Sequence, residues 1–440
     1  MSSTQIAVLG AGMAGMAAAN TLRDQDCTVY EARSHSGGHA SSFKVGAYTF
    51  DEGPHISFTK DERIRNFLAT SVQNKFNTHP TVVTNYYQGH VVPHPIHCNL
   101  HGLPTDLVNR AIASFVNAHG EQPTPLSNYK DWCDFSFGET ITETFVRPYM
   151  RKYWTLELEC LSIDWVAARI HAPTLEQVLV GALSKASKQY HYMKEFNYPQ
   201  LGGFGAYNAV LTGRSKIQYN HAVSEVNRKH KRITFSNGTH SHYEYLISSL
   251  PLPTLLHCLT ETPAQVLEAV NRLSCTSQFI VSLGIKRPTV NDAFWMCIYD
   301  ENVPFARVSF PSKFAESVAP DGYSSIQVEV AYSRHRPIDI QEDSILEKSI
   351  AGLQQCGILA NTTEIDCLDV RNIQFANVVF DLERTASLNI IHRYLTEIGI
   401  HWCGRYGDWA YHWTDQSMLS GERAANEVRT LLGLEPALFT

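Results

Sequence analysis

At the start of the chain, two short apolar runs are separated by three glycines and an alanine-rich stretch. A short apolar run, Ile6–Leu9, is followed by glycines at positions 10, 12 and 15 and then by the small and apolar residues of 16–22. A second apolar run covers 27–30 and ends at Glu31. Short apolar runs between turn residues are typical of buried strands, and the alanine-rich stretch between them favours a helix. The pattern predicts a strand, a tight turn, a helix and a second strand.

The three glycines have separate tasks in such a turn. Gly10 permits the sharp change of direction, Gly12 lets the backbone approach a pyrophosphate, and Gly15 lets the helix pack close to the strand. The first turn of the helix then offers free N–H groups and its positive dipole end to an anion. Glu31 follows about 20 residues later, where an acid can hold ribose hydroxyls. This segment therefore predicts a dinucleotide site.

Helical and strand-like patterns alternate along the rest of the chain. Helix is expected over 60–77, over most of 103–194, and from about Tyr207, where it opens after a glycine turn. Strand-like runs cover parts of 81–100 and the segments 49–58, 222–226, 232–235, 245–250, 278–284 and 325–331, with Asn237-Gly238 as a turn signal. The runs between 278 and 333 suggest an antiparallel sheet. From 398 onward the sequence predicts a strand, a Gly-Arg-Tyr-Gly turn and a final helix.

The recurrence of nucleotide-type elements at three places predicts a discontinuous domain. With 440 residues the chain is too long for one simple core. The fold class expected is α/β, with a Rossmann-like nucleotide-binding domain built from 1–80, 195–255 and 375–440. A mixed α+β substrate or cap domain, 81–194 and 256–374, is inserted between these parts. Sites in such folds lie at the junction of the domains.

Composition and charge indicate which kinds of partner and which cellular compartment to expect. A net charge of −7 argues against nucleic acid as the main partner. No apolar run is long enough to span a bilayer, and the first strand begins too early for a signal peptide. Ten cysteines without a CxxC pair are typical of a reduced, cytoplasmic protein.

A histidine-rich stretch and a set of arginines suggest further chemistry. His90, His94, His97 and His101 have the spacing of one helix face, but the prolines among them forbid a helix, so no metal site is expected. Arginines in apolar surroundings need an anionic partner, because burying an unpaired guanidinium is costly.

The glycine pair Gly37-Gly38, a few residues after Glu31, adds a family resemblance. The stretch from Glu31 to His39 is similar to the FAD-binding entrance of the amine oxidase and protoporphyrinogen oxidase superfamily, so the resemblance implies FAD as the cofactor. The cofactor-binding residues that it implies, together with the glycine turn, are Gly10, Gly12, Met13, Ala14, Gly15, Glu31, Ala32, Arg33, Gly37, Gly38, His39, His55, Val223, Gly404, Arg405, Asp415, Gln416 and Ser417.

Later segments resemble the UDP-galactopyranose mutases, especially the eukaryotic type, in motif order over nearly the full length. The stretches concerned are 51–55, 88–95, 145–154, 165–173, 304–307 and 404–411. The resemblance implies His55, Arg169 and Tyr411 as catalytic residues. It implies substrate binding by Arg307, Arg405, Trp154, Trp409 and Asp415, the last placed at the start of the final helix, where it can also cap that helix.

The departures from that pattern lie at positions that hold the nucleotide in the mutases. These positions carry His94, His97, Met150, Cys297, Phe314 and Asn377, and an acid, Asp415, replaces the asparagine of the family. The resulting hypothesis is an FAD-dependent oxidoreductase that acts on a small anionic substrate at flavin N5, with Arg307, Arg405 and Tyr411 holding that substrate. A flavin-dependent sugar mutase with an altered substrate and a flavin-binding protein without enzymatic activity are the alternatives.

Overall fold

The computed structural model describes residues 5–120, 125–166, 169–185, 190, 193–289, 291–338 and 341–439. Its first sheet is parallel and has the strand order β19-β13-β1-β2-β9. These strands are β1 (Ile6–Leu9), β2 (Cys27–Tyr30), β9 (Ile217–Gln218), β13 (Tyr245–Ser248) and β19 (Ile400–Trp402). Every residue of β1 and β2 is buried, which is why both strands are apolar on both faces. The predicted α/β class is confirmed.

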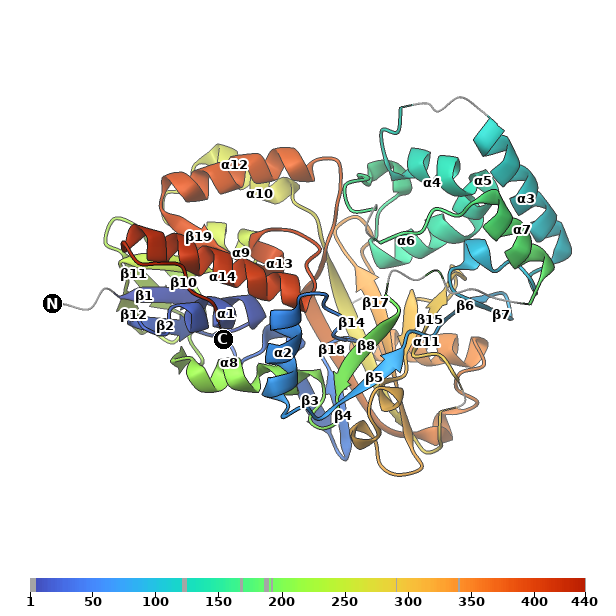
Figure 1. The fold of residues 1–440 in the computed structure, drawn as a ribbon, viewed down its shortest axis with the longest axis horizontal. Helices are drawn as coiled ribbons and strands as arrows, with labels where there is room; N and C mark the ends of the chain where they lie inside the picture. The colour runs from blue at the N-terminus through green and yellow to red at the C-terminus, as the bar shows by residue number, and fades with distance from the viewer. Residues whose placement is uncertain are drawn as a thin grey trace.

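Helices from both ends of the chain cover this sheet, and blue and red elements lie side by side in Figure 1. Helix α1 (Met13–Thr21) packs along α14 (Thr414–Leu431). Helix α8 (Ala209–Arg214) also packs on α1. The short helix α13 (Gly404–Gly407) contains the Gly-Arg-Tyr-Gly sequence that was expected as a turn.

A three-stranded antiparallel sheet lies within the second predicted segment of the nucleotide-binding domain, 195–255. It contains β10 (Val223–Asn227), β11 (Arg232–Phe235) and β12 (His240–His242). The turn at Asn237-Gly238 therefore leads into β12, a strand that was not predicted, and β13 begins after it. Helices α9 (Leu252–Cys258), α10 (Ala264–Arg272) and α12 (Arg384–Glu397) lie on this side, and α10 packs on α12 although residues 264–272 were expected in the other domain. The domain limits remain a prediction.

The second large sheet has seven strands in the order β18-β14-β17-β16-β15-β6-β7. The strands are β6 (Val83–Tyr87), β7 (His90–Pro93), β14 (Cys275–Ile285), β15 (Trp295–Ile298), β16 (Arg307–Ser309), β17 (Ser324–Tyr332) and β18 (Ile365–Val378). Strands β14 to β17 pair antiparallel as predicted, whereas β15 pairs parallel with β6. Helix α11 (Glu342–Gln355) packs against β14.

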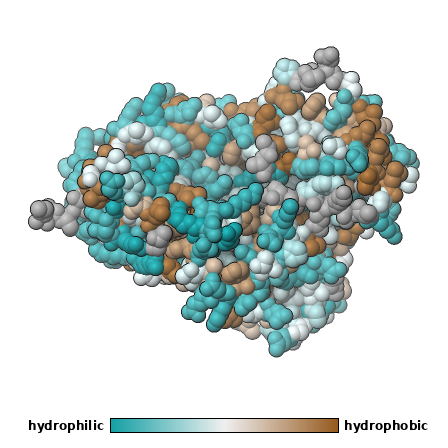
Figure 2. All heavy atoms as spheres, viewed as in Figure 1, coloured by the Kyte–Doolittle hydropathy of each residue, from teal (hydrophilic) through white to brown (hydrophobic). Residues whose placement is uncertain are grey.

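Helices dominate the region between β7 and β8, at the upper right of Figure 1. They are α3 (Thr105–Gly120), α4 (Tyr129–Phe137), α5 (Glu139–Ile141), a π-helical turn over Thr142–Val146, α6 (Arg147–Tyr153) and α7 (Leu175–Leu183). Side chains of Thr174 and Gln177 form a capping box at the start of α7. In Figure 2 hydrophobic residues gather at this end of the visible face, while most of that face is hydrophilic.

Short elements connect these parts. Strand β3 (Ser42–Val45) pairs with β4 (Tyr48–Asp51), and β5 (Phe76–Pro80) pairs with β8 (Glu195–Pro199). Helix α2 (Glu62–Ser71) ends earlier than expected, because β5 begins within the segment 60–77. No helix of the described ranges is long and apolar enough to cross a membrane.

The contact between α1 and α14 depends on a glycine that the sequence patterns did not single out. A Cβ on Gly421 would collide with the carbonyl oxygen of Ala14 and would lie 3.1 Å from the amide nitrogen of Ala18. Both atoms belong to the α1 backbone, which cannot move aside without disturbing the first sheet. Close packing of the two helices thus requires the absence of a side chain at position 421.

We therefore expect Gly421→Ala to destabilise the protein by about 1–3 kcal/mol, the range for forced overpacking. Chemical denaturation would measure the change. Gly213→Ala in α8 is the matched control, since no atom lies within 4 Å of the added Cβ. It should be neutral or stabilise the helix by up to about 1 kcal/mol. Equal stability of the two variants would contradict the proposed tight contact.

Candidate active site

The glycine turn after β1 has one position that leaves space beside the chain. Gly10 has a positive φ of +92°, and a Cβ there would lie 2.5 Å from the Ser249 hydroxyl oxygen. A Cβ on Gly15 would collide with the Gly10 carbonyl oxygen. By contrast, a Cβ on Gly12 would meet only the Cα of Gly38, at 4.0 Å. The fold thus needs glycine at positions 10 and 15, whereas Gly12 leaves room for a ligand.

The second glycine pair packs directly on the first turn. Gly37 and Gly38 both have positive φ, and the Gly37 N–H donates a 2.8 Å hydrogen bond to the Ala11 carbonyl. A Cβ on Gly37 would lie 2.6 Å from the side-chain nitrogen of Asn208, which itself donates to the Ala40 carbonyl. Two segments that are distant in sequence, 37–40 and 208, are therefore fixed against the turn after β1.

Glu31 closes the other side of this turn. One carboxylate oxygen accepts the Ala11 N–H at 2.7 Å, and the other accepts the Arg33 N–H at 2.9 Å. Each oxygen keeps a free lone-pair direction for a hydroxyl donor. The Arg33 side chain pairs with the carboxylate of Glu52 at 2.7 Å, and Ala32 is exposed between them.

The chain end meets this region at Gly404 and Tyr406. A Cβ on Gly404 would lie 2.8 Å from the Cβ of Ala14, next to Met13 at the start of α1. The Tyr406 hydroxyl and His39 Nδ1 form a 2.9 Å hydrogen bond. Removal from water lowers the pKa of His39 to about 3. His39 is therefore neutral at physiological pH.

Asp415, Gln416 and Ser417 lie in the first turn of α14, as predicted. The expectation that Asp415 caps this helix is wrong. The residue before the helix is Trp413, and its N–H donates at 2.9 Å to the side-chain oxygen of Gln416. Val223, the remaining residue expected near the cofactor, begins β10 and is half-buried against the core of that side.

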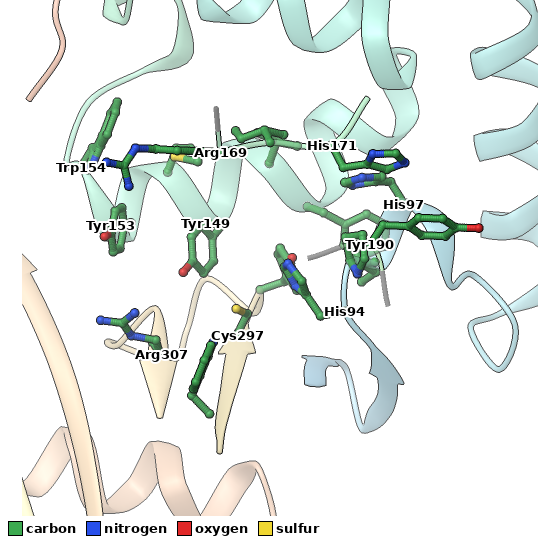
Figure 3. A pocket seen from close by; sticks show the side chains of 18 of the residues that line it. His94, His97, Tyr149, Tyr153, Trp154, Arg169, His171, Tyr190, Cys297 and Arg307 are labelled. Carbon is green, nitrogen blue, oxygen red and sulfur yellow. The ribbon is translucent and has the colours of Figure 1, made fainter. Parts of the chain in front are cut away.

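A cavity of about 270 Å³ lies between the helices α4 and α6 and the strands β15 and β16 (Figure 3). Aromatic rings form most of its wall, including Tyr149, Tyr153, Trp154, Tyr299 and Trp413. Pro54 and Ile56 border it on either side of His55. The cavity thus reaches the two neighbours of His55, though not His55 itself, and it reaches Trp413 at the start of α14. The cofactor is expected near both places.

Five of the six positions that depart from the mutase pattern line this same cavity. They are His94, His97, Met150, Cys297 and Phe314. The sixth, Asn377, accepts a 2.9 Å hydrogen bond from Arg405. Burial raises the pKa of the Cys297 thiol to about 11, so this cysteine is protonated and is no nucleophile at neutral pH.

Arg169 and Arg405 both lie over the ring of Tyr411. The guanidinium carbons are 4.1 Å and 4.6 Å from the ring centre, and that of Arg169 is also 4.5 Å from the centre of the Trp413 ring. Arg169 additionally donates to the Tyr411 carbonyl. Nε of Arg405 is buried without a hydrogen-bond partner among the described residues. This buried N–H is available to a bound ligand.

Arg307 differs from the other two arginines, because it is paired within the protein. Its Nε donates to the carboxylate of Glu329, which also accepts a 2.7 Å hydrogen bond from Gln278. Arg307 and Glu329 lie opposite each other in the pairing of β16 with β17. Glu329 is thus the carboxylate partner that a buried guanidinium needs, and Arg307 also lines the cavity, so its role in substrate binding remains a prediction.

The other residues predicted for catalysis or substrate binding are divided between cavity and core. Trp154 and Tyr411 line the cavity, and the Tyr411 hydroxyl is hydrogen-bonded to that of Tyr153. Trp409 is fully buried in the core and does not line the cavity. The His55 ring is hydrogen-bonded to the Gly53 carbonyl at 2.8 Å, and burial lowers its pKa.

Sequence reasoning missed Tyr149, Tyr153 and Glu329. The two tyrosines are four residues apart on α6, which places them on one face of the helix, and this spacing was available as a signal. Glu329 gave none, because its role depends on the pairing of β16 with β17. Among the described residues, no group of three or more His, Cys, Asp or Glu side chains is placed to hold a metal ion.

The cradle around Gly12 fits the dinucleotide that the sequence predicts. It combines the uncapped start of α1, the open space at Gly12 and the Glu31 carboxylate. N–H groups at the start of a helix suit a diphosphate, and a buried acid suits a ribose.

We expect Gly12→Val to prevent FAD binding without unfolding the protein, because the added side chain enters the ligand's space rather than the core. Purified variant protein should lack the visible absorbance of oxidised flavin. Its thermal melt should match that of the flavin-free wild type. Gly15→Val is the contrasting variant and should lower the melting temperature, since its Cβ collides with the backbone. Normal flavin content in Gly12→Val would contradict the assignment.

His39 predicts a pH dependence of stability. Between pH 6.5 and about 3 the unfolded chain binds a proton that folded His39 does not, so the free energy of unfolding falls as pH falls through this window. One such group contributes at most about 1.4 kcal/mol per pH unit. His39→Asn should show a shallower loss of stability between pH 6 and 4, measured by denaturant titration. Parallel curves for variant and wild type would contradict this.

Comparison with known proteins identifies the family. The model of the flavin-containing amine oxidoreductases matches residues 13–429. A 4,4'-diapophytoene desaturase of Staphylococcus haemolyticus (strain JCSC1435) is 43% identical over 58 residues, which span only 13% of this chain and 12% of the desaturase.

Two solved structures share the fold over almost the whole chain. A reduced UDP-galactopyranose mutase superposes with a TM-score of 0.91 at 24% identity, covering 99% of this chain and 95% of that chain. A structure assigned to protoporphyrinogen oxidase, from Exiguobacterium sp. 255-15, gives 0.78 at 13% identity, covering 98% and 100%. The resemblance drawn from the motifs is confirmed: the chain belongs to the flavin-containing amine oxidoreductase family and is an FAD-dependent oxidoreductase.

Proposed function

We propose that the protein oxidises a small organic substrate with a mostly apolar body and an anionic group, bound in the aromatic cavity. The observation that carries this proposal is the position of Arg169, between the rings of Tyr411 and Trp413 at the cavity wall. An apolar body suits the aromatic lining, and a carboxylate or similar group suits a guanidinium.

The charge balance favours an anion over an ammonium substrate, despite the name of the family. Aromatic faces bind cations, but those of Tyr411 and Trp413 already face the guanidinium of Arg169. Arg405 lies over the same tyrosine, and no carboxylate of the described residues forms a salt bridge with it. An ammonium group entering here would meet two like charges.

FAD, when bound, supplies the chemistry by accepting a hydride equivalent from the substrate. The chain's own residues position the substrate and exclude water. The hydrogen bond between Tyr153 and Tyr411 fixes both phenols at the cavity wall, and Arg307, paired with Glu329, lines the same cavity. These fixed dipoles provide an ordered polar surface at one end of an otherwise apolar space.

The lining favours an oxidoreductase over a sugar mutase. Met150, Cys297 and Phe314 offer a nucleotide few hydrogen-bond donors, although they occupy positions that hold the nucleotide in the mutases. A redox reaction would bleach oxidised flavin on addition of substrate without air. A redox-neutral mutase would turn over only after the flavin is reduced with dithionite, and this outcome would overturn the oxidation proposal.

All ten cysteines are free in the structure, and Cys160 is the exposed one. Free thiols suit a reducing compartment, so we also propose a cytoplasmic location.

Two probes of opposite charge test whether the site prefers an anionic or a cationic ligand. We expect benzoate to perturb the flavin spectrum of the holoprotein at a concentration at least tenfold lower than benzylammonium does, because both share one ring and differ in charge. Arg405 does not line the cavity, but its guanidinium lies over the ring of Tyr411, which does, and its buried Nε has no partner among the described residues. If this N–H pairs with the carboxylate, replacing Arg405 with Gln should weaken benzoate binding by about 2–5 kcal/mol, the range for breaking a desolvated charge pair. Lysine at this position should restore only part of the affinity.

The Arg307→Gln variant is the control for the loss of an arginine whose charge is already balanced within the protein. Its charge is balanced by Glu329, so this change should not reproduce the loss seen at Arg405. Tighter binding of benzylammonium than of benzoate in the wild type would contradict the anionic proposal. FAD content should be checked in every variant, because Arg405 is also expected near the cofactor.

A further inference from the structure

The polar residues of the cavity are separated into two groups. In Figure 3 Arg169, Trp154, Tyr153 and Arg307 lie at one end, and His94, His97, His171 and Tyr190 lie at the other. Tyr149 and Cys297 lie between the two groups. A substrate held at the arginine end therefore directs its far end toward the histidines.

His97 is the histidine in this group whose hydrogen bonding is incomplete. Its side chain is nine-tenths buried, with an exposed fraction of 8%, and its ring stacks on Phe137 with 4.5 Å between the ring centres. The ring lies near the backbone of His171, yet Nε2 has no hydrogen-bond partner among the described residues. The other two histidines do have partners: His94 contacts Asn85 at 3.1 Å, and His171 contacts Gln177 at 2.8 Å.

The nearby backbone carbonyl of His171 favours one tautomer of His97. A carbonyl can only accept, so Nδ1 carries the proton and Nε2 presents a lone pair. Burial lowers the pKa of His97 to about 3, so the ring is neutral at physiological pH and attracts no anion. A buried acceptor of this kind is stabilised when a donor reaches it and costs free energy when none does.

We infer that His97 Nε2 accepts a hydrogen bond from an uncharged donor, a hydroxyl or an N–H group, at the substrate end remote from the arginines. The substrate class is thus an apolar molecule with an anionic group at one end and a hydroxyl or N–H donor at the other. This inference rests on the proposed function in taking the cavity as the substrate site. A phosphate at the histidine end is disfavoured, because a neutral acceptor repels its oxygens.

Two pairs of probes test the inference on the holoprotein, with dissociation constants taken from the change in flavin absorbance. The anionic pair is 3-(4-hydroxyphenyl)propionate and 3-phenylpropionate, and the neutral pair consists of the two corresponding propanamides. We expect the hydroxyl member to bind about tenfold more tightly in each pair, as for one hydrogen bond to a buried acceptor. In His97→Phe this ratio should fall to about one, while affinity for the phenyl members changes little.

Two further variants serve as controls. His97→Gln keeps an acceptor and should restore part of the preference for the hydroxyl, which a purely structural role of His97 would not produce. His90→Gln alters a histidine of β7 that does not line the cavity, and it should leave the preference unchanged.

The outcomes separate this inference from the proposed function. Equal binding of both members by the wild type, or an unchanged preference in His97→Phe, would overturn the role of His97. A hydroxyl preference in both pairs, without tighter binding of the acids than of the amides, would overturn the anionic substrate but support the role of His97. Absence of binding by all four probes would overturn both, and tighter binding of uridine monophosphate than of any probe would overturn the substrate class.

Discussion

The site depends on the close contact of the first helix with the last part of the chain. Ala14 in α1 lies against two glycines from the C-terminal segment, Gly404 and Gly421, and neither position has room for a side chain. Because of this contact, α13 packs against α1, and Tyr406 is hydrogen-bonded to His39 beside the second glycine pair. Residues separated by about four hundred positions thus form one site, and the packing of two backbones holds them there.

Strand pairing decides the electrostatics of the cavity. Arg307 and Arg405 look alike in the sequence, since each stands among apolar and aromatic residues. The pairing of β16 with β17 sets Glu329 opposite Arg307, which balances that charge, whereas Arg405 finds an amide oxygen and an aromatic face. One guanidinium therefore belongs to the fold and the other remains available to a ligand. The distinction matters because a balanced charge gives little binding energy to an anion.

Burial shapes the rest of the chemistry. The same aromatic wall that suits an apolar substrate keeps His97 neutral and Cys297 protonated. A neutral acceptor and a thiol select ligands by shape and hydrogen bonding rather than by charge. Guanidinium and imidazole groups thus lie at opposite ends of the cavity, with Tyr149 and Cys297 between them.

Elements with local signals could be predicted from the sequence. The strand–turn–helix–strand at 6–31 follows from glycine conformation and apolar periodicity, as do the strands of 278–331 and the final helix. The sequence also determined the family and hence the cofactor, through glycine spacings that few folds require. The same local signals failed at β12, whose His-Ser-His sequence carries no strand pattern, and at Asp415, where the side chain of Gln416 satisfies the helix start instead. Three features depend on tertiary contacts. Trp409 is buried in the core, Glu329 balances the charge of Arg307, and Nε2 of the cavity residue His97 has no partner among the described residues. Each of these depends on which distant segment packs beside a residue, and local sequence patterns carry no information about that neighbour.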